Sequence, residues 1–214
     1  MKHLQFIYLF AAAILLTNCY PGGPENTDDY DLVASNYAEE YGFDKNLTYF
    51  MPDSVIHVVD STTKEEDIDR SQDETILARV ESNMEMMGYL RDTIDINADV
   101  VLLPQVLRIQ NVDVSWWYDW SYWWGYYPWG GWWGPGYGWY YPGGYPVVTS
   151  YETGTIILQM VDPDEPTPLP DDIYVAWSGY ANGVLSSSKN YNKSRIETTI
   201  DDMFEISPYL ELNN

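Results

Sequence analysis

Histidine, the side chain best suited to acid–base chemistry at neutral pH, is scarce in this sequence. Its two histidines are His3 and His57, and His3 lies in an amino-terminal segment that we expect to be removed. A Ser-His-Asp or Cys-His site would therefore have to use His57. Because His57 stands between Ile56 and Val58 in a β-branched run, we expect it to be a structural residue of a strand.

Carboxylates are abundant, with 33 Asp and Glu in the chain. Asp113 and Asp119, before and within an aromatic run, could supply the pair of acids that hydrolyses a glycosidic bond. Among so many acids, however, some fall near aromatic rings by chance. We therefore expect a protein that is not an enzyme, and keep a carboxylate-dependent glycan-processing enzyme as the alternative.

Metal and cofactor sites find little support in the sequence. Asp162, Asp164 and Glu165 could offer oxygens to Ca²⁺, but their spacing does not match an EF-hand loop and Pro163 interrupts it. This stretch predicts a solvated turn. The sequence also lacks a multi-histidine zinc pattern, a thiolate pair and a Gly-rich phosphate loop with a Lys. We expect no metal and no cofactor.

Cys19 is the sole cysteine, and it follows an apolar run from Leu4 to Leu16 that begins after Lys2. The run is shorter than the ~20 residues that a transmembrane helix needs, so residues 1–18 are typical of a cleaved export signal. Leu-Thr-Asn-Cys at its end resembles a bacterial lipobox of the Bacteroidetes type, whose Cys becomes acylated. This resemblance implies palmitate on Cys19 and membrane anchorage through an N-terminal lipid. The residue after Cys19 is Tyr20, whereas an Asp at this position would resemble an inner-membrane retention signal. We therefore expect the outer membrane, and whether the protein faces the periplasm or the cell surface stays open.

An aromatic run at residues 116–141 contains nine of the ten tryptophans. Pro128, Pro135 and Pro142 exclude a central strand, and the density of Gly and Pro excludes a helix. Three interpretations stay open: a loop collapsed on its own domain, a platform for a glycan or an envelope protein, and a segment at the headgroup level of a membrane. The candidate contact residues are the tryptophans of this run: Trp116, Trp117, Trp120, Trp123, Trp124, Trp129, Trp132, Trp133 and Trp139.

The charge balance argues against nucleic acid as a partner. The formal net charge is −23, and no Lys or Arg occurs between Arg108 and Lys189, the interval that holds the aromatic run. Aromatic platforms for single-stranded nucleic acid lie in positively charged grooves, which this interval cannot form.

Hydrophobic patterns predict the elements that position these residues. Strands are predicted at 46–50 and 54–60, and at 98–103 with a continuation to 114 and a break at Pro104. Residues 155–162 and 173–180 predict an antiparallel hairpin with a long loop. A helix is predicted from a capping box at Ser71 and Glu74 to Gly88, and a second one at 192–206, before Pro208. The buried stripe predicted for the first helix is Ile76, Val80, Met84 and Met87. The apolar residues predicted on or near one face of the second helix are Ile196, Ile200, Met203, Phe204 and Ile206.

These elements predict one α+β domain, with two amphipathic helices on one face of a mainly antiparallel sheet. The predicted order is β-β-α-β-(aromatic insert)-β-β-α. The predicted organisation is a signal peptide at 1–18, a flexible tether at 19–29 and a single domain at 30–210 that carries a Trp/Tyr/Gly-rich insert at 115–146.

Several stretches together resemble a known family. They are the lipobox, Met-Gly-Tyr at 87–89, Ala-Asp-Val at 98–100, the aromatic insert, Gly-Thr-Ile at 154–156, Ala-Trp-Ser-Gly-Tyr-Ala at 176–181 and Ser-Pro at 207–208. This combination resembles the bacterial lipoproteins that carry domain of unknown function 4136. The resemblance implies a lipoprotein with an α+β fold, and it assigns no catalytic residue.

Overall fold

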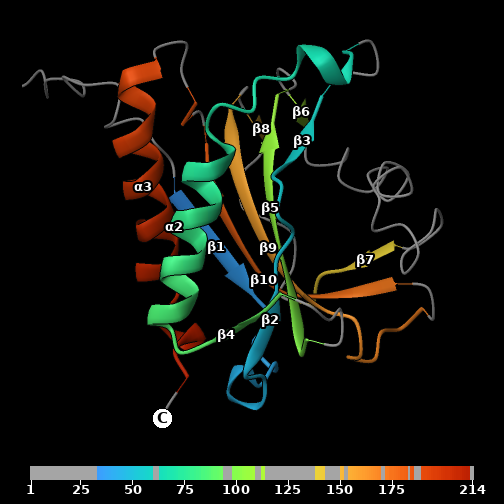
Figure 1. The fold of residues 1–214 in the computed structure, drawn as a ribbon. Coiled ribbons are helices and arrows are strands. Elements are labelled where there is room, and N and C mark those ends of the chain that lie inside the picture. The colour runs from blue at the N-terminus through green and yellow to red at the C-terminus, as the bar shows by residue number, and fades with distance from the viewer. Residues whose placement is uncertain are drawn as a thin grey trace, which may run out of the picture. The chain divides into compact units, whose positions relative to one another are not determined.

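The computed structural model is a mixed α+β fold, in which an open, mostly antiparallel sheet carries helices on one face (Figure 1). These elements belong to one unit, Asp31–Asn214. The structure describes residues 33–59, 63–93, 98–108, 112–113, 138–142, 150–151, 154–169, 172–182, 184–185 and 189–212.

Three long strands form the centre of the sheet. β5 (Val100–Leu107) pairs antiparallel with β9 (Thr155–Asp162), which pairs antiparallel with β10 (Asp172–Ala181). Every residue of β5 and β9 is buried, as the apolar composition of these stretches predicts for strands covered on both faces. The predicted hairpin of 155–162 with 173–180 is confirmed.

Short strands extend the sheet on either side. β1 (Val33–Tyr37) pairs antiparallel with β10 at one edge. At the other edge, β2 (Thr48–Phe50) pairs parallel with β4 (Leu90–Asp92) and β5, and β3 (Ile56–Val58) pairs parallel with β5. The predicted order lacks β1 and β4. Ala, Ser and Asn give β1 little intrinsic strand propensity, so its pairing with β10 decides its conformation.

The predicted break at Pro104 does not occur, because β5 continues through it. Pro104 lies where the neighbour of β5 changes: β2 pairs with Val100 and Val101, and β3 pairs from Gln105 onward. A proline lacks the N–H that a ladder needs, and it is tolerated where pairing on one side is interrupted. The interruption falls in the neighbouring strands and leaves β5 intact.

Part of the predicted insert belongs to the sheet. β7 (Gly138–Tyr140), near the end of residues 115–146, pairs parallel with Asp172–Tyr174 of β10. A separate small sheet joins β6 (Val112–Asp113) to β8 (Ser150–Tyr151). The sequence does not indicate these three strands, since each is only two or three residues long.

Helix α2 (Asp73–Met86) buries Ile76, Val80 and Met84 of the predicted stripe, whereas Met87 is the C-cap residue and is only partly buried. It ends at Gly88, whose φ is 97°, with Gly88 N–H donating to Glu85 O and Tyr89 N–H donating to Met84 O. These two bonds form a Schellman motif, which explains why the helical pattern stops at a glycine.

The predicted capping box at the start of α2 is wrong. Gln72 is the N-cap residue and makes no side-chain capping bond. Ser71 N–H instead donates to Asp69 Oδ1 at 3.0 Å in the preceding turn. The first helical residue is Asp73, whose carboxylate is hydrogen-bonded to His57 and Arg70.

Helix α3 (Lys189–Glu205) buries Ile196, Ile200, Met203 and Phe204. Ile206, predicted on or near the same face, lies beyond the helix and is 46% exposed. The helix ends at Glu205, and Pro208 begins a 3₁₀ turn, η6 (Pro208–Leu210). The described ranges also contain the 3₁₀ turns η2 (Phe43–Lys45) and η3 (Glu65–Asp67).

The sheet has two different faces. Helices α2 and α3 pack against each other and on the first face, over Leu102, Leu158 and Trp177 (Figure 1). The second face carries a smaller cluster that includes Val101 and Leu103. Among the described residues, no helix is long and apolar enough to span a membrane.

Candidate functional site

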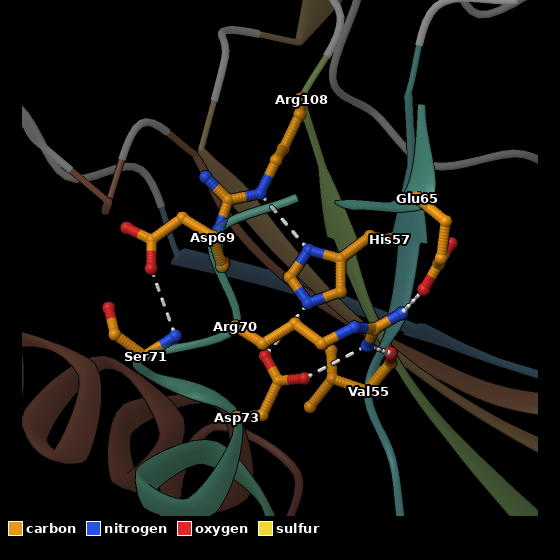
Figure 2. Close-up of polar contacts among 8 residues, drawn as sticks. All are labelled: Val55, His57, Glu65, Asp69, Arg70, Ser71, Asp73 and Arg108. Carbon is orange, nitrogen blue, oxygen red and sulfur yellow. Dashed lines mark hydrogen bonds and ion pairs between the residues drawn. The ribbon is translucent and has the colours of Figure 1, made fainter. Parts of the chain in front are cut away.

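His57 lies on β3 with its side chain 1% exposed (Figure 2). Its Nε2 lies 2.8 Å from Asp73 Oδ1, and Arg108 Nε donates to its Nδ1 at 3.0 Å. Asp73 is the first residue of α2, where the helix dipole favours a negative charge. Arg108 directly follows β5. The imidazole therefore joins three elements: β3, β5 and α2.

The tautomer of His57 follows from these partners. A guanidinium has no acceptor, so Nδ1 of His57 must accept the hydrogen bond from Arg108. This assigns the ring hydrogen to Nε2, which donates it to Asp73. With both nitrogens engaged, the geometry supports the structural role that the sequence predicts for His57.

Arg70 closes the network around Asp73. Arg70 Nη1 donates to Asp73 Oδ2 at 3.1 Å and to Val55 O at 3.2 Å, and Nη2 donates to Glu65 Oε1 at 2.5 Å (Figure 2). Arg108 Nη2 donates to Asp69 O at 2.5 Å. The two arginines hold the loop between β3 and α2 against the sheet, and each carboxylate oxygen of Asp73 accepts a bond.

A groove of about 600 Å³ lies beside this network. Carboxylates dominate its lining, and no aromatic ring occurs among the described residues that line it. The described part of its lining therefore offers acids without rings beside them. The lining residues are Asp53, Ser54, Glu65, Arg70, Asp73, Glu74, Leu77, Ala78 and Glu81.

The predicted solvated turn at 162–165 is wrong for Asp162, which is 5% exposed. Tyr41 O–H donates to Asp162 Oδ2 at 2.8 Å, and the backbone N–H groups of Asp164 and Glu165 donate to Oδ1 at 2.9 and 3.0 Å. These three donors replace water and make burial of the carboxylate tolerable. Burial, followed by the charge of Asp162, raises the pKa of the Tyr41 hydroxyl.

Asn46 Nδ2 in turn donates to the hydroxyl oxygen of Tyr41, which completes a second polar cluster. The Asp162 oxygens are occupied by protein donors rather than arranged around an ion. Within the described ranges, no group of three or more His, Cys, Asp or Glu side chains is placed to hold a metal ion.

Of the predicted contact tryptophans, the structure describes Trp139. It lies on β7, is half-buried and packs against the second-face cluster of the sheet. The other predicted sites fall outside the described residues, as does Asp119, and the side chain of Asp113 is not described. Outside are Cys19, Trp116, Trp117, Trp120, Trp123, Trp124, Trp129, Trp132 and Trp133.

Two polar features escaped prediction from sequence. The first is the pair of arginines around His57, for which the only local signal is the i,i+3 spacing of Arg70 and Asp73. The second is Gln105 and Gln159, polar residues within otherwise apolar buried strands. Both glutamines could have been found from sequence, because an amide in such a run must be buried and needs partners.

Comparison with known proteins identifies relatives of this chain. The family model described as Domain of unknown function (DUF4136) matches residues 33–209. The crystal structure of a DUF4136 family protein from Bacteroides thetaiotaomicron is similar with a TM-score of 0.61 and 29% identity, covering 84% of this chain and 97% of that chain.

A PelC dodecamer from Paraburkholderia phytofirmans aligns over 86% of this chain and 99% of that chain, with a TM-score of 0.38 and 9% identity. No curated protein matches the chain.

Proposed function

This chain belongs to the DUF4136 family, and from that premise we propose that it is a lipid-anchored, non-enzymatic protein of the cell envelope. Its α+β domain acts as a scaffold that holds the aromatic insert as a contact surface. The insert binds a glycan, an envelope protein or the membrane surface. The family has no named function, so the proposal depends on the residues of this chain.

One observation carries the proposal: Cys19, the sole cysteine, stands directly after a lipobox-like Leu-Thr-Asn at the end of an apolar run. An unpaired cysteine in an exported protein needs a chemical reason, and acylation supplies one. Each buried methylene contributes about 0.8 kcal/mol, so two or more acyl chains on one residue anchor a protein stably. Tyr20 favours delivery to the outer membrane.

The polar clusters support a scaffold rather than a catalytic site. Both nitrogens of His57 and both oxygens of Asp73 are used to join β3, β5 and α2. Asp162 is held by Tyr41 and by two backbone N–H groups. Groups with these partners stabilise the fold, whereas a general acid or base must be within reach of a substrate proton.

Metabolic labelling tests the anchor. The full chain is expressed in a bacterial host with radioactive palmitate, beside a Cys19→Ala variant. We expect the wild-type chain to be labelled and to fractionate with membranes, and the variant to be unlabelled. An unlabelled wild-type chain, processed and free in the culture fluid, would refute the proposal.

A second experiment tests the contact surface. The mature chain, made as residues 19–214 with Cys19→Ala, is titrated with cell-wall glycans and with liposomes while tryptophan fluorescence is followed. A variant that lacks residues 116–137 but keeps β7 is the control. A blue shift with one ligand that the control loses identifies that ligand class. Release of reducing sugar from the glycans would instead favour the enzyme.

A further inference from the structure

The second face of the central sheet is buried, although both described α helices lie on the first face. Val101, Leu103, Val161 and Val175 on this face are 0–4% exposed. Among the described residues, the partly buried hydrophobic side chains that pack against their cluster are Trp139 and Tyr141, near the carboxyl end of the aromatic insert. Strands β5, β9 and β10 thus present an apolar surface on which the end of the insert is already seated.

A polar chain of hydrogen bonds crosses this face. Gln105 Nε2 donates to Gln159 Oε1, and Gln159 Nε2 donates to Tyr141 O–H at 2.7 Å. The two glutamines are 0% and 2% exposed. Among the residues that the structure describes, none donates a hydrogen bond to Gln105 Oε1, although a buried carbonyl oxygen of this kind is normally paired. On this face, an acceptor without a partner from the described ranges thus lies among the side chains that Trp139 and Tyr141 pack against or bind.

We infer that this face is the docking surface for residues 114–137 of the same chain, with an indole N–H of that segment donating to Gln105 Oε1. The segment leads directly into β7, in which Gly138 pairs with Asp172 of β10. Trp139, which follows Gly138, packs on the face. It contains eight tryptophans. An indole is a donor without an acceptor, so a buried one needs an oxygen such as Gln105 Oε1.

The size of the face limits how many rings dock. Three strands spaced ~4.8 Å apart, each about eight residues long at ~3.3 Å per residue, present roughly 400 Å². A tryptophan side chain buries about 150–250 Å² of its surface, and when its ring lies flat on the sheet, about half of that area contacts the sheet. Roughly four rings therefore fill the face. Trp139 and Tyr141 take part of it. The segment's remaining rings stay available, so this inference is compatible with the proposed contact surface but does not depend on it.

Three variants of the mature chain with Cys19→Ala test the inference: deletion of 116–137, Gln105→Leu and Gln72→Leu. The last is the matched control, since Gln72 lies at the start of α2 and makes no side-chain capping bond. Deletion should expose the face, raising the fluorescence of the apolar dye anilinonaphthalene sulfonate several-fold and lowering the urea midpoint. Unchanged dye binding and an unchanged midpoint would refute docking.

Hydrogen exchange of the indole N–H groups, followed by NMR, keeps the test decisive if the deletion variant does not fold. In the wild-type chain, at least one indole of the segment should exchange at least tenfold more slowly than a free indole. Gln105→Leu should remove that protection, and Gln72→Leu should not. Free exchange of all eight indoles, or protection that survives Gln105→Leu, would overturn the inference. Neither outcome bears on acylation of Cys19, so the two proposals fail separately.

Discussion

Gly154, which precedes β9, occupies a backbone conformation that other residues adopt at a cost. Its φ is 91°, and an added Cβ would lie 2.6 Å from Leu185 O. Its own N–H donates to Leu107 O at 2.7 Å, so it also ties β9 to the end of β5. We predict that Gly154→Ala lowers the free energy of unfolding by about 1–3 kcal/mol, as measured by urea denaturation.

Gly42→Ala is the control for this prediction. Gly42 has a φ of −87°, and its added Cβ would meet Asp44 Oδ1 at 3.4 Å, an ordinary contact. Alanine fits this conformation, so we expect little change or a slight gain in stability. Equal losses at both glycines would contradict the role of φ at Gly154.

His57 stabilises the fold through hydrogen bonds at both of its ring nitrogens. We predict that His57→Phe, which keeps an aromatic ring but removes both hydrogen bonds, costs about 1–3 kcal/mol because Asp73 and Arg108 lose their partner. Arg108→Leu should cost less in the His57→Phe background than in the wild-type chain. Additive losses in urea denaturation would show that the two side chains are not coupled.

At the scale of elements, an ion pair joins the two helices. Arg79 Nε of α2 donates to Asp201 Oδ1 of α3 at 2.5 Å, Arg79 Nη2 donates to Asp201 Oδ2, and Asn83 Nδ2 donates to Asp201 Oδ1 at 2.9 Å. Arg79 and Asp201 are about one-third exposed, so solvent screens their attraction.

A double-mutant cycle with Arg79→Ala and Asp201→Ala should give a coupling of about 0.5–1 kcal/mol, since the pair is bidentate but partly exposed. The matched cycle on Lys193 and Glu197 should give almost none. That pair lies within α3, its charged atoms are 3.9 Å apart, and its side chains are 70% and 40% exposed. A coupling no larger at Arg79–Asp201 than at Lys193–Glu197 would show that the helices are held by apolar packing.

Asp99 joins the beginning of β2 to the beginning of β5. Its Oδ2 accepts bonds from Leu47 N–H at 2.9 Å, Thr48 N–H at 2.8 Å and Thr48 Oγ1 at 2.8 Å. Burial opposes ionisation of this carboxyl, but the hydrogen bonds from Thr48 and Leu47 outweigh burial and lower its pKa below the ordinary 3.8. The charged carboxylate is thus the form that links the two strands.

The lowered pKa of Asp99 predicts the direction of a pH effect. A carboxyl whose pKa is lower in the folded state contributes stability above its unfolded pKa and loses it as the pH falls through the folded pKa. Asp99→Asn should therefore lower the free energy of unfolding at neutral pH. This loss should shrink as the pH falls below about 3.8. Urea denaturation between pH 7 and pH 2 measures the difference, and a loss that stays constant would refute the assignment.

At the scale of the whole molecule, residues 31–214 form one unit with a core on each face of the sheet. We predict that a chain of residues 31–214 unfolds within about 2 °C of the mature chain with Cys19→Ala, because its core lies within that range. Differential scanning calorimetry measures both chains. A transition temperature lower by more than about 5 °C would show that residues 19–30 contribute to folding.

Local patterns in the sequence were sufficient for the hairpin of β9 with β10, the stripe of Ile76, Val80 and Met84, and the end of α2 at Gly88. Each depends on residues close together in the chain: alternation or continuous apolar character for strands, a 3.6-residue period for a helix, and a positive φ for a glycine. The family resemblance rests on the same stretches. The sequence therefore determined the α+β class and the main central elements.

Only the tertiary structure decided the roles of residues whose partners are distant in sequence. Pro104 stays within β5 because two strands from elsewhere share one side of it, and Asp162 is buried because Tyr41 reaches it across 121 residues. Trp139 packs on the sheet because β7 pairs with β10. Burial and hydrogen-bond partners are properties of neighbours in space, and a sequence read along the chain does not contain them until the sheet brings those neighbours together.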